Sequence, residues 1–243
     1  MATSTGTIDE ERNFYKNTYS FVKRHSATNN EFIDRFAKGD ISSEEFKRFS
    51  KEFYHFTREW PSILSVLLVN TPNEEDAANL TTILVSELGD SDPRKRHELL
   101  YRKYLRSIGI DPEPLIKSKQ VGTTKAWLDG MRSYFAGDLY EALGAEFGLE
   151  NMAIPMWDKI LAGFETLFKK YPEFSKADIE YFTFHRELES HHEEAMKDVL
   201  GTHKSDPEAR EKFVKGAKGI LDLEEKFWLG LSDAANSPAS LRK

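Results

Sequence analysis

Hydrophobic residues recur every three or four positions along nearly the whole chain, which is the spacing that places them on one face of an α-helix. Capping residues, glycines and prolines divide this pattern into separate helices. Two of the longer helices contain an internal proline, Pro61 and Pro155, where we expect a kink or an interruption. The predicted helices span residues 9–25, 31–37, 42–69, 74–88, 92–108, 123–135, 139–171, 175–201 and 206–231, with Thr124 and Asp178 as alternative first residues of the sixth and eighth helices.

The chain lacks the patterns that indicate other fold classes. It has no hairpin signal, no strand–helix alternation, no internal repeat and no linker rich in glycine and serine. The sequence therefore predicts a single all-α domain over residues 9–231, with disordered ends at residues 1–8 and 232–243.

The helix expected over residues 42–69 carries a strongly aromatic stripe. Ser42 and Glu45 have the spacing of a capping box at its start. A stripe of this kind is more often part of a core than a cofactor-binding surface. We therefore expect its aromatic members to pack in the interior: Phe46, Phe49, Phe53, Phe56 and Trp60.

The composition limits the partners and cofactors that the chain can have. The formal net charge is −7 and the pI is about 5.6, which argues against a nucleic-acid partner because that binding needs clustered lysines and arginines. The chain contains no cysteine, which excludes disulfides, iron–sulfur clusters, thiolate-ligated haem and a cysteine nucleophile. Any metal must therefore be held by nitrogen and oxygen atoms.

Nothing in the sequence predicts a membrane location. The first residues are small and polar and lack the basic-then-apolar pattern of a signal peptide. The most apolar run, residues 63–69, is far shorter than the roughly 20 residues that a membrane span requires. We therefore expect a cytoplasmic protein without a membrane partner.

Residues 181–196, Y-F-T-F-H-R-E-L-E-S-H-H-E-E-A-M, contain the most unusual polar pattern of the chain. On a helix, His185, Glu189 and His192 fall on the same face as the apolar residues of this stretch. Two imidazoles and a carboxylate on one face could offer lone pairs to one divalent metal ion. Taken alone, the stretch is equally consistent with a solvated helix whose histidines pair with neighbouring glutamates.

Three other predicted helices also place an ionisable residue on their apolar face. These residues are Glu87, His97 and Glu150, and Glu146 lies close to the same face as Glu150. Burying such groups is costly unless they are paired or bound to a metal. Helical bundles build dinuclear iron or manganese sites from inward-facing carboxylates and histidines, so we interpret these residues as parts of one site.

Two stretches resemble the iron-binding halves of the haem-oxygenase-like diiron oxidases. One is E-L-G-D-S-D-P-R-K-R-H at residues 87–97, and the other is Y-F-x-x-H-x-x-x-E-x-x-H at residues 181–192. The similarity covers roughly residues 74–200 and is to the CADD-like proteins, which are named after the death-domain-associating protein of Chlamydia. These proteins belong to a wider group with the fold of TenA and of the pyrroloquinoline-quinone synthase PqqC. The resemblance implies a single haem-oxygenase-like bundle of seven to eight helices.

The resemblance also implies a site for two iron ions, with manganese as the alternative, and dioxygen as co-substrate. Glu150 is preferred to Glu146 because it is central in its stripe and precedes an Ile-Pro pair that often follows it in relatives. Many relatives have aspartate where Glu189 stands. The spacing from Glu87 to His97 is also longer than in some members, and Gly89 and Pro93 accommodate the difference. The implied metal ligands are Glu87, His97, Glu150, His185, Glu189 and His192.

The predicted function is a non-haem dinuclear iron oxidase or oxygenase that acts on a small amino-acid-like or fatty-acid-like substrate. We expect the chain to form a homodimer, as its relatives suggest. One alternative is a metal-free cofactor-biosynthesis enzyme of the PqqC or TenA type, although TenA-type thiamin hydrolysis depends on a cysteine that this chain lacks. Others are a haem protein with His25 or His55 as axial ligand, and a non-enzymatic interaction protein that binds no metal.

Overall fold

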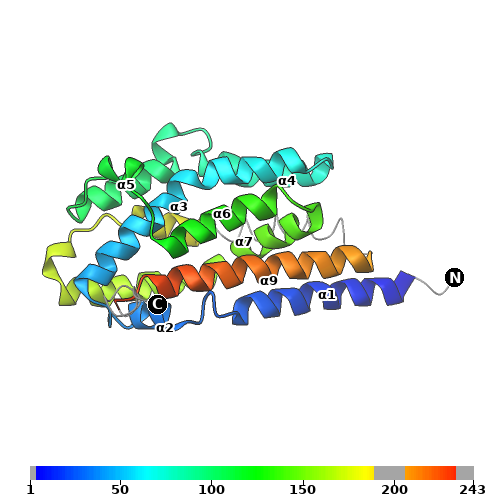
Figure 1. The fold of residues 1–243 in the computed structure, drawn as a ribbon, viewed down its shortest axis with the longest axis horizontal. Coiled ribbons are helices and arrows are strands. Elements are labelled where there is room, and N and C mark those ends of the chain that lie inside the picture. The colour runs from blue at the N-terminus through cyan, green and yellow to red at the C-terminus, as the bar shows by residue number, and fades with distance from the viewer. Residues whose placement is uncertain (1–3, 189–205, 234–243) are drawn as a thin grey trace.

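The structure, a computed structural model, describes residues 4–188 and 206–233. In these ranges it contains α-helices and short 3-10 helices and no β-strand, so the predicted all-α fold is confirmed (Figure 1). Residues 180–188 are helical as well. The remaining elements are α1 (Ser4–Arg24), α2 (Glu31–Ala37), α3 (Ser43–Asn70), α4 (Glu74–Glu87), η1 (Pro93–Lys95), α5 (His97–Ser107), η2 (Pro114–Lys117), α6 (Gly122–Phe135), α7 (Leu139–Lys170), η3 (Pro172–Phe174) and α9 (Pro207–Gly230).

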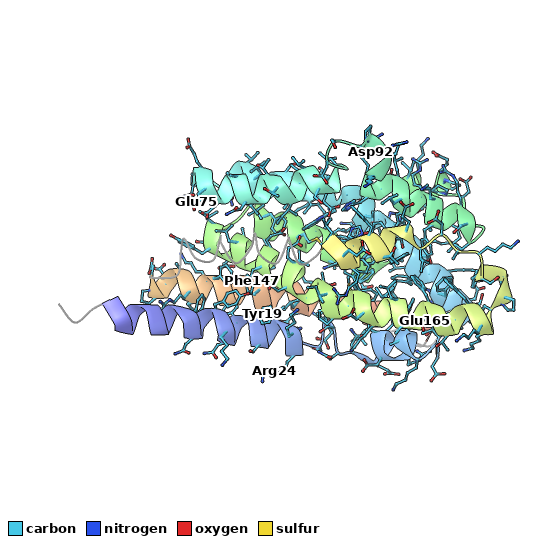
Figure 2. All side chains as sticks on the ribbon, turned by 180° about the vertical axis from the view of Figure 1, so that it is seen from behind. Tyr19, Arg24, Glu75, Asp92, Phe147 and Glu165 are labelled. Atoms are coloured by element: carbon cyan, nitrogen blue, oxygen red, sulfur yellow. The ribbon has the colours of Figure 1, made fainter. Side chains whose placement is uncertain are left out.

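The long helix α7 runs through the middle of the bundle. It packs most extensively against α9 and also contacts α1, α2, α3 and α6, which explains why so much of its surface is apolar and buried. Where α7 passes α1, Phe147 meets Tyr15 edge-on with 6.0 Å between ring centroids. Figure 2 labels Phe147 on α7 and Tyr19 on the neighbouring α1. In both views α4 and α9 lie on different sides of the bundle, and α9 lies beside α1. Within the described ranges, no helix combines the length and the apolar composition that a membrane crossing requires.

Two glycines allow the backbones of α7 and α9 to approach closely. A Cβ atom on Gly144 of α7 would collide with the carbonyl oxygen of Phe213 on α9. A Cβ atom on Gly216 of α9 would collide with the carbonyl oxygen of Glu141 on α7. Because both obstructing atoms belong to the backbone, a side-chain rotation cannot relieve either collision.

Replacing Gly144 with alanine is therefore expected to lower the free energy of unfolding by about 1–3 kcal/mol, because the two helices must move apart. Urea unfolding of the metal-free protein measures this change. Gly122→Ala is the control, since a Cβ atom at that position at the start of α6 meets nothing within 4 Å. Equal unfolding midpoints for Gly144→Ala and the wild type would contradict the close backbone contact.

Helix α3 begins as predicted. The Ser42 side chain accepts a hydrogen bond from the Glu45 backbone N–H at 3.0 Å, and Glu45 Oε2 accepts one from the Ser42 backbone N–H at 2.9 Å. Most of the aromatic stripe on this helix is buried in the core, and Phe56 is half-buried. The buried members are Phe46, Phe49, Phe53 and Trp60.

The helices differ from the prediction at their internal prolines and at the start of α5 and of α1. Both α3 and α7 continue through their prolines, so the interruption predicted at Pro155 is wrong. A proline inside a helix costs about 3 kcal/mol, and the buried residues on both sides of Pro155 offset that loss. The segment around Pro93 forms η1, so α5 begins only at His97. Finally, α1 starts at Ser4, which makes residues 4–8 helical where disorder was predicted.

Candidate metal centre

A tight turn between α4 and α5 brings two predicted ligands together. Gly89 has a φ of +90°, and a Cβ atom there would collide with the carbonyl oxygen of Asp92. Asp92 Oδ1 then accepts the Arg94 backbone N–H at 3.0 Å and starts η1. Figure 2 shows Asp92 beyond one end of α4 and Glu75 at the other. The turn therefore places Glu87, the last residue of α4, against the first residue of α5.

Glu87 and His97 converge without forming a hydrogen bond. Nδ1 of His97 lies 2.6 Å from Oε2 of Glu87, and the two side chains are 1% and 5% exposed, respectively. Neither ring nitrogen of His97 has a hydrogen-bond partner of acceptable geometry in the described part of the chain. A buried imidazole without such a partner lowers the stability of the folded protein. The arrangement suits two ligands that are aimed at one ion.

His185 is oriented by its own helix. Its Nδ1 lies 2.7 Å from the carbonyl oxygen of Tyr181. A carbonyl oxygen only accepts, so Nδ1 carries the proton and the lone pair of the neutral ring is at Nε2. Metal-binding histidines are commonly held in this way, with one nitrogen donating to a carbonyl and the other coordinating. The His185 ring lies 4.2 Å from the His97 ring, centroid to centroid.

The structure thus brings three of the six predicted ligands into one compact group. One donor atom from each of Glu87, His97 and His185 lies within 4.8 Å of the others, and all three residues are buried. The other two residues predicted on the His185 helix, Glu189 and His192, lie outside the described residues. The group joins three helices that are separate in sequence, as the buried-polar pattern predicted.

Glu150 is near this group but is not part of it. It is 5% exposed and lines the same cavity as Glu87 and His185. Glu146, one turn earlier on α7, is fully buried and does not line that cavity. Of the two mid-chain candidates, Glu150 is the one that lines the cavity, and its role as a ligand stays a prediction.

The cavity is small, largely apolar and rich in aromatic side chains. Its volume is about 50 Å³. Tyr181 lines it, and its hydroxyl group lies 3.2 Å from Oγ1 of Thr57, which lines it too. No lysine or arginine of the described ranges is among the lining residues. The main apolar lining residues are Phe53, Phe56, Trp60, Trp127, Met152, Met156 and Trp157.

Sequence reasoning missed one ionisable residue of the cavity, Glu224 on α9. Its side chain is 1% exposed, and Oε2 has no hydrogen-bond partner in the described part of the chain. Burial raises the pKa of this carboxyl from 4.5 to about 8. The indole N–H of Trp228 lowers that pKa by a smaller amount, although its geometry falls short of a hydrogen bond. Glu224 is therefore a neutral acid in the metal-free protein at neutral pH.

The chain's family can be decided by comparison with known proteins. Residues 47–225 match the family described as iron-containing redox enzymes. The chain belongs to this family. The match spans α3 to α9, so it includes the compact group and the cavity.

Individual relatives share most of the length of this chain but a low fraction of its residues. It is 26% identical to the 4-chloro-allylglycine synthase of Streptantibioticus cattleyicolor, over 87% of this chain and 80% of that protein. It is 23% identical to the 4-aminobenzoate synthase of Chlamydia muridarum, over 91% of this chain and 94% of that protein. A CADD-like protein from Nostoc punctiforme has the same fold, with a TM-score of 0.77 and 17% identity over 94% of this chain and 99% of that one. The predicted CADD-like relationship is confirmed.

The donor set of this family member fits iron. Carboxylate oxygens and imidazole nitrogens, without any sulfur ligand, suit iron or manganese. His97 supplies the structural observation, because its buried Nε2 has no hydrogen-bond partner among the described residues and its Nδ1 meets Oε2 of Glu87 outside hydrogen-bond geometry. Glu87, His97 and His185 would hold the metal, and Glu150 lies at the same cavity.

The histidines considered for a haem are engaged elsewhere. His25 Nδ1 accepts the Ala27 backbone N–H at 3.1 Å, and its Nε2 lies 3.2 Å from Oδ1 of Asp222. His55 is buried with its Nε2 3.3 Å from the Ser118 hydroxyl group, and burial lowers its pKa. Neither histidine lines the cavity. The structure gives no support to the haem alternative.

Proposed function

We propose that this redox enzyme is a non-haem dinuclear iron oxidase or oxygenase that uses dioxygen to oxidise a small organic substrate. The observation that carries the proposal is the buried convergence of Glu87, His97 and His185, with both nitrogens of His97 lacking a hydrogen-bond partner in the described ranges. When bound there, iron would supply the reduction of dioxygen that drives the oxidation.

The protein would contribute orientation and the exclusion of water. The Tyr181 carbonyl holds the His185 ring so that its Nε2 can coordinate. The aromatic and methionine side chains of the cavity would hold an organic substrate beside the ligands and keep bulk water out. The cavity is small enough to favour a compact substrate over a long acyl chain.

We propose further that the substrate carries an amino group. The products named for the two relatives, an allylglycine and an aminobenzoate, each carry an amino group as well as a carboxylate. The described lining of the cavity offers carboxyl groups and no lysine or arginine, which favours an amine over a free carboxylate away from the metal.

Anaerobic loading with Fe(II) tests the metal assignment. We expect about two irons per chain after removal of excess metal. Rapid mixing with dioxygen should then give absorbance changes that are faster with a suitable amino acid than with a fatty acid of similar length. An iron content near zero under these conditions would remove the proposal. Mn(II) loading provides the comparison for the alternative ion.

A further inference from the structure

The cavity has a second polar position, which the metal ligands do not explain. Glu224 comes from α9, whereas the three clustered donors come from α4, α5 and residues 180–188. In Figures 1 and 2, α4 and α9 lie on different sides of the bundle. Glu224 nevertheless lines the same cavity as Glu87 and His185. The cavity therefore runs between the metal ligands and a separate buried carboxyl group.

One oxygen of this carboxyl group lacks a hydrogen-bond donor among the residues that the structure describes. Its Oε2 has no hydrogen-bond partner within the described ranges, although the side chain is only 1% exposed. No lysine or arginine of those ranges lines the cavity, so the described lining supplies no counter-ion. A buried carboxyl oxygen without a donor reduces stability and is retained where something else provides the donor.

The surroundings of Glu224 suit a cation. Phe56 and Trp127 line the same cavity and stack with ring centroids 4.7 Å apart, and Phe227 of α9 stacks on Trp127 at 4.5 Å. Aromatic faces attract an ammonium group, and Glu224 would form a strong charge-assisted hydrogen bond with one after releasing its proton on binding. A substrate carboxylate would instead add a further acidic group to a lining that already holds Glu87 and Glu150.

We propose that Glu224 is the recognition group for the substrate's amine, which it binds at the end of the cavity away from the metal ligands. This assignment rests on the proposed function and chooses between its two substrate classes, amine-bearing molecules and fatty acids. The apolar part of the substrate then lies along Met152, Met156 and Trp157, and its other end reaches toward Glu87 and His185. Glu224 acts as a binding residue and holds no metal.

The test measures binding to the metal-free, full-length protein, so that it does not depend on iron or on turnover. Hexylamine, hexanoate and hexanol are titrated by calorimetry at neutral pH, with quenching of tryptophan fluorescence as a second signal, because Trp60, Trp127 and Trp157 line the cavity. Hexylamine should bind to the wild type more tightly than hexanol, and hexanoate should bind least.

Glu224→Gln should weaken hexylamine binding by about ten- to a hundredfold, the range expected for a lost charge-assisted hydrogen bond, and leave hexanol binding unchanged. Glu211→Gln, at an exposed position on the same helix, is the matched control and should bind hexylamine like the wild type. Circular dichroism checks the fold of each variant. The order in which the wild type binds the three ligands tests the proposal even if a variant fails to fold.

Three results would overturn the assignment: no hexylamine binding by the wild type, tighter binding of hexanoate than of hexylamine, or equal hexylamine binding by Glu224→Gln and the wild type. Iron loading is measured separately. Amine binding that depends on Glu224 in a protein that takes up no iron would contradict the proposed function and support the assignment. Iron uptake without amine binding would support the proposed function and contradict the assignment of Glu224.

Discussion

His97→Ala is expected to reduce the iron content from about two ions per chain to one or none. This histidine is 1% exposed, its Nδ1 lies 2.6 Å from Oε2 of Glu87, and both of its ring nitrogens lack a hydrogen-bond partner in the described ranges. Removing it takes away one of the three donors that the structure brings within 4.8 Å. Iron analysis after anaerobic loading measures the loss.

A control for this variant must remove an equally buried histidine from another place. His55→Ala meets that need, since His55 is also 1% exposed but does not line the cavity. It should keep full iron content even if both variants lose stability through the space left behind. Added Fe(II) should raise the melting temperature of His55→Ala and the wild type more than that of His97→Ala, because ligand binding stabilises only a folded state with an intact site. Full iron content in His97→Ala would remove His97 from the ligand set.

Most of the candidate site could be predicted because each candidate ligand breaks the apolar pattern of its own helix. Glu87, His97, Glu150 and His185 were chosen for that reason, and all four are buried. The rule works because a buried charge is costly, so an ionisable residue in an apolar stripe usually has a partner or a function. Which of these residues share one metal could not be predicted in the same way, since that depends on the turn at Gly89 and on how α4, α5 and α7 meet.

The rule also accounts for the residue that was missed. Glu224 shares its face of α9 with Ile220, Phe227 and Trp228, so the same signal was present in the sequence. This helix contains no histidine and no stretch that resembles an iron-binding sequence, so no second signal pointed to Glu224. The interruption predicted at Pro155 fails for the opposite reason, because packing around α7 overrides the low helix propensity of proline.

Glu224→Gln is expected to stabilise the metal-free protein at pH values near 8, with a gain that shrinks as the pH falls toward 4.5. In the unfolded chain this carboxyl group has its ordinary pKa of 4.5, and in the folded protein burial raises the pKa to about 8. Between these values the folded state holds a proton that the unfolded state has released. The wild type therefore loses stability as the pH rises through this window.

The slope is about 1.4 kcal/mol per pH unit where the group is protonated only in the folded state, so the total difference over the window is of the order of 3–5 kcal/mol. Glutamine keeps the size of the side chain and does not titrate, so the variant lacks this contribution. Urea unfolding across the pH range gives the free energies, with Glu211→Gln as the exposed control on the same helix. Parallel stability curves for Glu224→Gln and the wild type would show that Glu224 is already ionised in the folded protein. In that case its counter-ion would have to come from the protein itself, and the need for an amine ligand would disappear.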